Sequence, residues 1–149
     1  MRNISSRRSP TGRRYQAVII AAALLAACQH KSPEQELADK ADPAASWIST
    51  LQMAGEKWTA NSVPTSFVKT TWQAAREDLK QNARDAAESK ARPEVRDPLR
   101  RLIAETQGSG FSLLQATEAN DRPGAARQAG RLAGLRKQFE AWKKSVGSP

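Results

Sequence analysis

The side chain best placed for covalent chemistry in this chain is the thiol of Cys28, the one cysteine among 149 residues. A single cysteine cannot form a disulfide within its own chain, so the thiol either stays unpaired or is modified. Leu25, Ala26 and Ala27 come directly before it, one aliphatic residue and two small ones. This pattern favours covalent modification over a disulfide framework.

The rest of the sequence lacks the residue types of most catalytic and metal centres. The one histidine is His30, two residues after Cys28. Covalent haem needs Cys-x-x-Cys-His, a di-iron bundle needs paired Glu-x-x-His motifs, and zinc needs several Cys or His ligands. The sequence after residue 30 offers no Ser-His or Cys-His pair and no Gly-rich phosphate loop. We therefore expect no metal, no cofactor and no enzymatic activity.

The segment before Cys28 has the organisation of an export signal. Residues 1–16 contain five arginines and no acid, and an apolar run of eleven residues follows at positions 17–27. A basic start, an apolar stretch of about 7–15 residues and small residues at the cut are typical of a secretory signal peptide. A membrane-spanning helix needs about 20 apolar residues. The alternative is a buried core helix, although such helices usually carry polar residues on one face.

Leu25-Ala26-Ala27-Cys28 resembles the lipobox of bacterial lipoproteins. The resemblance covers residues 1–28 and does not identify the family of the domain that follows. It implies that residues 1–27 are removed as a signal peptide and that the Cys28 thiol receives a diacylglycerol, with further acylation of the new N-terminus. Two or three acyl chains anchor a domain stably at a bilayer, whereas one chain anchors it only marginally. The alternative is an exported protein with an unpaired thiol.

The same resemblance predicts a location in the bacterial cell envelope, facing the periplasm, with the membrane as a partner through the lipid on Cys28. In the lipoproteins of enteric bacteria, an aspartate after the lipidated cysteine favours retention at the inner membrane. Gln29 occupies that position here. We therefore favour the outer membrane over the inner membrane.

Removal of the leader changes the electrostatic interpretation of the chain. The full sequence has a net charge of +9, from 24 basic and 15 acidic residues. Residues 1–27 hold five of the bases and none of the acids, which leaves 19 bases, 15 acids and a net charge of +4. The excess of positive charge is thus poor evidence for nucleic-acid binding, and we expect no nucleic-acid partner.

Hydrophobic spacing after residue 28 predicts an all-α protein. Apolar residues recur every three or four positions in four stretches, near positions 42–61, 65–89, 97–117 and 125–146. Asp42-Pro43 and Asp97-Pro98 are typical helix starts. Short loops join the stretches, so we expect an up-down-up-down four-helix bundle over residues 43–149, preceded by a lipidated N-terminus and tether at 28–42.

The expected tether contains one helix signal. Ser32-Pro33-Glu34-Gln35 has serine at the N-cap, proline at the first helical position and glutamine at the third. Leu37 is the only sizeable apolar residue before Asp42. A helix here is therefore expected to fray in solvent and to act as a spacer.

The third helical stretch is interrupted by Gly108 and Gly110. Its apolar register continues through both glycines, which favours one helix with a weakened middle. Two short helices are the alternative.

Five large aromatic residues lie on the apolar stripes of the predicted helices. We interpret them as core residues, because each one falls on its helix's apolar face, and a ligand or partner pocket is the alternative. They are Trp47, Trp58, Trp72, Phe139 and Trp142.

Two functions of different classes fit these observations. The first is a non-catalytic binding, scaffolding or inhibitory module that contacts another envelope protein. The second is contact with anionic lipid or lipopolysaccharide phosphate through a basic face of the last helix, although the same charges also suit an ordinary solvated surface. The residues of that face are Arg127, Arg131, Lys137, Lys143 and Lys144.

Overall fold

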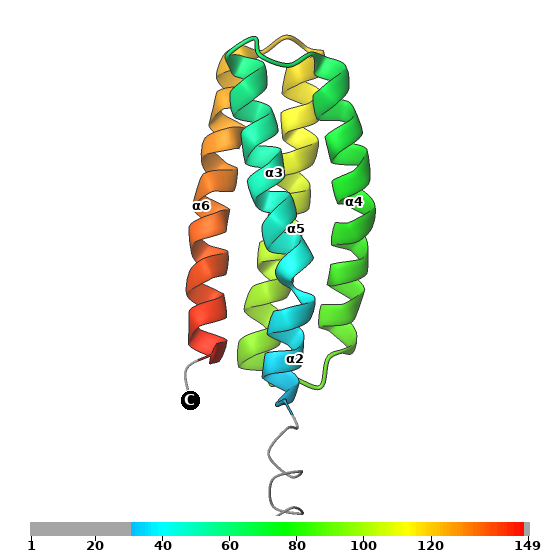
Figure 1. Ribbon diagram of the computed structural model, residues 1–149, viewed down its shortest axis with the longest axis vertical. Helices are drawn as coiled ribbons and strands as arrows, with labels where there is room; N and C mark the ends of the chain where they lie inside the picture. The colour runs from blue at the N-terminus through cyan, green and yellow to red at the C-terminus, as the bar shows by residue number, and fades with distance from the viewer. Residues whose placement is uncertain (1–30, 148–149) are drawn as a thin grey trace, which may run out of the picture. The chain divides into compact units, whose positions relative to one another are not determined.

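A computed structural model of the chain describes residues 31–147 (Figure 1). The predicted signal peptide, Cys28, Gln29 and His30 lie outside the described residues. Within the described part the all-α prediction is confirmed. The helices are α2 (Pro33–Lys40), α3 (Asp42–Thr59), α4 (Thr65–Glu88), α5 (Pro93–Glu118) and α6 (Arg122–Gly147).

The four long helices form the predicted up-down-up-down bundle. Each packs along the helix that precedes it in the chain, and α6 returns to pack against α3 (Figure 1). α4 and α6 lie diagonally across the bundle and do not contact each other. The core between the helices is made of aliphatic side chains that are fully enclosed, among them Leu51, Leu79, Leu113 and Leu132.

Two turns of the same kind close one end of the bundle. Asn61, after α3, and Asn120, after α5, have φ angles of 58° and 54°, a left-handed conformation that asparagine tolerates better than most residues. Arg122 links the two turns, because its Nη1 donates to the Thr59 carbonyl at 3.2 Å and its Nη2 donates to Asn61 Oδ1. Its guanidinium also lies over the ring of Trp58, 5.8 Å from the centroid. Both turns lie between the expected helical stretches, although α6 begins at Arg122, three residues before the start expected at position 125.

The expectation of a frayed, solvated helix in the tether is wrong for residues 33–41. The predicted capping box forms, with Gln35 N donating to Ser32 Oγ and Ser32 N donating to Gln35 Oε1, each at 3.2 Å. Leu37 is only 2 % exposed, and Ala38 and Ala41 are also buried. One leucine and two alanines suffice here because α2 reaches the open end of the bundle, where all four long helices contact it. The folded domain therefore begins at Ser32.

Proline positions set the boundary between α2 and α3. Pro43 has no N–H to continue the hydrogen-bond ladder of α2, so the helix is interrupted at Ala41 and α3 begins at Asp42. Asp42 was expected to cap this helix. Instead Ala41 is the N-cap, without a side-chain hydrogen bond, and the Asp42 carboxylate pairs with Lys143 of α6.

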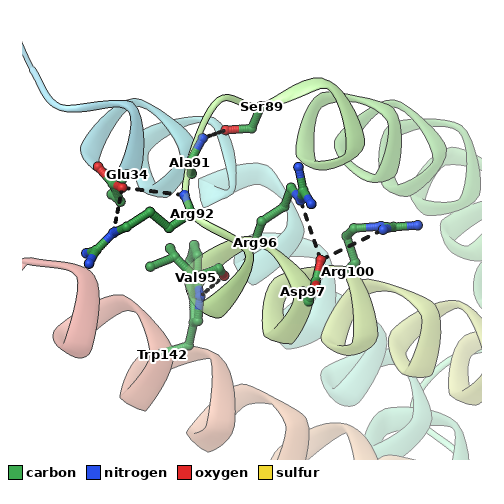
Figure 2. A network of polar contacts seen from close by, with 9 residues as sticks. All are labelled: Glu34, Ser89, Ala91, Arg92, Val95, Arg96, Asp97, Arg100 and Trp142. Carbon is green, nitrogen blue, oxygen red and sulfur yellow. Dashed lines mark hydrogen bonds and ion pairs between the residues drawn. The ribbon is translucent and has the colours of Figure 1, made fainter.

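The start expected at Asp97-Pro98 is also wrong, since α5 begins four residues earlier and contains Pro98. Pro93 is the first helical residue, and Pro98 lies near enough to the N-terminus to remove one hydrogen bond without ending the helix. A contact that sequence spacing does not reveal holds this first turn. The indole Nε1 of Trp142 donates to the Val95 carbonyl at 2.8 Å (Figure 2).

The prediction of one continuous helix through Gly108 and Gly110 is confirmed. Gly110 is buried against α4, and a Cβ at this position would lie 2.5 Å from Cζ3 of Trp72. A Cβ on Gly108 would meet nothing within 4 Å. Gly110 therefore permits the close approach of α4 to α5, whereas Gly108 has no packing role.

Aromatic side chains fill the core at both ends of the bundle, as expected. Trp58, Trp72, Trp142 and Phe139 are at most 7 % exposed, and the rings of Phe139 and Trp142 lie 5.4 Å apart. Trp47 is only half-buried, and its indole Nε1 donates to Asp78 Oδ2 of α4 at 2.8 Å. These tryptophans thus serve packing and interhelical hydrogen bonding.

Candidate functional site

The residue with the most specific sequence signal, Cys28, lies outside the described residues, so its lipidation stays a prediction. What the structure adds is the start of the folded domain, four residues later at Ser32. Four residues span at most about 14 Å when extended. A lipid on Cys28 would therefore hold the α2 end of the bundle close to the bilayer surface.

Glu34 connects α2 to the turn between α4 and α5. Its Oε1 accepts hydrogen bonds from Arg92 Nε at 3.1 Å and from the Arg92 backbone N–H at 3.5 Å (Figure 2). Hydrogen bonds from its own backbone N–H and from the Arg92 guanidinium hold the pKa of the Glu34 carboxyl below its ordinary value. Both cross-links are made by the charged form of the carboxylate.

The five basic residues predicted to share a face of the last helix do not form one uniform surface. Arg131 Nη2 lies 3.7 Å from Glu105 Oε2 on the α5 side of α6. Lys143 pairs with Asp42 on the opposite side, toward α3.

The other three residues of this set lie between those two sides or near the turn before α6. Arg127 Nη2 lies 3.8 Å from Asp121 Oδ2 in that turn. Lys137 and Lys144 are exposed on the outer side of α6, seven residues apart. Because Arg127, Arg131 and Lys143 all lie beside acids, the net positive charge of this helix surface is lower than its sequence suggests.

A different surface combines a groove with an excess of positive charge. It lies between α4 and α5 and has a volume of about 590 Å³. We call it the α4/α5 groove. Ala83 of α4 and Ala104 of α5 are its small central residues, and its remaining lining comes from Asp97, Arg100, Arg101 and Gln107.

Basic residues of α4 extend one wall of the α4/α5 groove toward the opposite end of the bundle. Lys69, Arg76, Lys80 and Ala83 follow one another at intervals of seven, four and three, so they lie along one side of the helix. The ion pair of Lys69 with Glu118 of α5, at 3.9 Å, shows that this side of α4 faces α5.

The charges on the two walls of the groove are unequal. The lining of the groove itself has a net charge of +1, from Arg100 and Arg101 against Asp97. Beyond the lining, the same side of the bundle carries four bases of α4 and two acids: Lys69, Arg76, Lys80 and Arg84, with Glu77 and Glu118. Glu77 lies within 3.5 Å of both Arg76 and Lys80. Among residues 31–147, no acid lies within ion-pair distance of Arg84 or Arg101.

Sequence reasoning missed this surface because neither helix reveals it alone. The interval pattern of the α4 bases is visible in the sequence, but the same pattern suits any solvated helix face. Only the packing of α4 beside α5 places those bases on the same side of the bundle as Arg100 and Arg101.

No group of His, Cys, Asp or Glu suited to holding a metal ion occurs within residues 31–147. In the same range, no helix combines the length and the apolar character needed to cross a membrane. Searches with this chain found no matching protein-family model, no matching curated protein and no matching solved structure.

Proposed function

We propose that this protein is a lipoprotein of the bacterial cell envelope whose helical bundle binds another envelope protein without catalysing a reaction. The observation that carries the proposal is the order of elements around Cys28. A basic leader and an apolar run end in Leu25-Ala26-Ala27-Cys28, and a folded domain begins at Ser32, shortly afterwards. A lipid anchor at that cysteine would present the bundle at the membrane surface.

Two features of the bundle support a binding role. The aromatic residues, for which a ligand pocket was the alternative interpretation, pack in the core, with Trp58, Trp72 and Trp142 almost fully enclosed. The surface instead offers an open groove between α4 and α5 with charged residues in its lining, which suits a macromolecular partner better than a small ligand.

Substitution of Cys28 by serine tests the anchor. Cys28→Ser should lose acyl labelling from a radioactive or clickable palmitate and should leave an uncleaved precursor or a protein released from the membrane fraction. The Ala27→Gly chain keeps a small residue before the cysteine and should be processed like the parent chain.

Labelling with the acyl probe, mass spectrometry of the N-terminus and membrane fractionation give independent readouts. A Cys28→Ser protein that is cleaved normally and still fractionates with membranes would refute the lipoprotein assignment.

Contact with anionic lipid through α6 is the second candidate function, and three of its five proposed bases lie beside acids. Binding to phosphatidylglycerol vesicles that falls steeply with salt, and that is lost on reversal of Lys143 and Lys144, would favour that function instead.

A further inference from the structure

We propose that the α4/α5 groove is the docking site for an acidic amphipathic helix of a partner protein. This inference rests on the proposed function, because it assigns a surface and a partner chemistry to the binding role of the bundle. Three properties of the groove support it: its shape, its charge and an exposed aromatic side chain beside it.

The shape of the groove suits a third helix. Ala83 and Ala104 place small side chains at its centre, between two antiparallel helices. Ridges of side chains on one helix pack into the grooves that other helices form, and small residues allow a close approach. On α5 the lining runs from Asp97 to Gln107, about 15 Å at 1.5 Å per residue. A partner helix of about three turns would match that length.

The charge of the groove selects an acidic partner. Its lining has a net charge of +1, from Arg100 and Arg101 against Asp97, and four further bases of α4 lie on the same side of the bundle. Neither Arg101 nor Arg84 makes an ion pair within residues 31–147, so a partner carboxylate would not have to displace one, although Arg84 Nη2 already donates to Gln81 Oε1 at 2.8 Å. Arginine also binds carboxylates through two parallel hydrogen bonds, which fixes the register of a helix as well as attracting it.

An exposed aromatic residue extends the α5 wall. Ala104, Gln107 and Phe111 recur at intervals of three and four along α5, and Phe111 is 50 % exposed. Buried aromatic side chains supply much of the binding energy at protein interfaces. The partner helix should therefore carry an apolar residue near one end and Asp or Glu along both edges of its contacting face.

A photo-crosslinking residue placed in the groove of the full-length protein tests this proposal in the native envelope. Ala104 is exposed and lines the groove, whereas Ala126 of α6, which is also exposed, lies outside it and serves as the matched position. We expect adducts from position 104 and none from position 126. Mass spectrometry should map the trapped segment to an Asp- and Glu-rich amphipathic helix.

Charge reversal then tests the contribution of the arginines. Arg100→Glu with Arg101→Glu should reduce the adduct from position 104 at least about tenfold, because like charges across an interface oppose association. Arg127→Glu with Lys137→Glu changes the net charge equally, but on α6, and should leave the yield unchanged. The neutral pair Arg100→Gln with Arg101→Gln should give an intermediate yield. Circular dichroism and thermal melting confirm that each variant is folded.

Several outcomes would overturn the proposal. They are a trapped segment without acidic residues, adducts with lipid only, equal yields at both positions, and insensitivity to the Arg100 and Arg101 reversals. Absence of any protein adduct would overturn it as well. Because the Cys28→Ser experiment reads acylation and membrane attachment directly, a groove that fails while the anchor is confirmed leaves the lipoprotein assignment intact.

Discussion

Gly108 and Gly110 lie two residues apart in α5, yet the same substitution should have opposite effects at the two positions. An alanine at Gly110 would place its Cβ 2.5 Å from Cζ3 and 2.6 Å from Cε3 of Trp72, and 3.2 Å from Cδ1 of Leu51. Trp72 is 6 % exposed and Leu51 is fully buried, so neither side chain has space into which it can move. An alanine at Gly108 would touch nothing within 4 Å.

The expected magnitudes follow from two opposing effects. Replacing a glycine inside a helix by alanine gains about 1 kcal/mol from helix propensity. Overpacking a rigid core typically costs about 1–3 kcal/mol, and a ring contact this short belongs at the upper end. Gly108→Ala should therefore raise the free energy of unfolding by about 1 kcal/mol, and Gly110→Ala should lower it by about 2 kcal/mol.

Urea unfolding of the purified protein, followed by circular dichroism, measures both changes. In a domain of this size each kcal/mol should shift the melting temperature by about 4 °C. The control is a double-mutant cycle with Trp72→Leu, which removes the two ring atoms concerned and should abolish most of the Gly110→Ala penalty. If Gly110→Ala is as stable as the parent protein, the close approach of α4 and α5 is refuted.

Two further predictions concern α2. Leu37→Ala should lower the free energy of unfolding by about 2–4 kcal/mol in the same urea assay, whereas Glu36→Ala, on the exposed side, should change it by no more than about 0.5 kcal/mol; equal effects would contradict the burial of Leu37. The pKa of Glu34 is depressed in the folded protein from an ordinary 4.5, so its contribution to stability is present above that value and is lost as the pH falls through the folded pKa. Melting temperatures measured from about pH 6 to about pH 3 should therefore fall less steeply in Glu34→Gln than in the parent protein; parallel curves would argue against the Arg92 contact.

The four long helices were predictable because their apolar residues repeat strictly every three or four positions. The same periodicity predicted that one helix continues through Gly108 and Gly110, because the apolar register of α5 is unbroken across both glycines. The boundaries were less predictable, because they depend on contacts made after folding. The first turn of α5 is stabilised by the hydrogen bond from Trp142 to the Val95 carbonyl, 47 residues away in sequence. No local sequence pattern predicts that hydrogen bond.

The packing of α2 escaped prediction for a related reason. A single leucine in a polar stretch is weak evidence of burial. Leu37 is buried only because the four long helices leave an apolar site at the end of the bundle into which it packs. The charged surfaces show the same limit. Intervals along α6 suggested a basic face, but acids from other segments, such as Glu105, lie beside those bases.

The place of α2 in the chain also determines how the domain would respond to mechanical load. Tension applied from the N-terminal side of Ser32 reaches α2 before it reaches any long helix. The load would therefore act first on the Glu34–Arg92 ion pair and on the packing contacts of the buried Leu37 side chain. Release of α2 would convert about 12 Å of helix into about 27 Å of extended chain. Release of α2 would thus be the first extension that the domain makes under load.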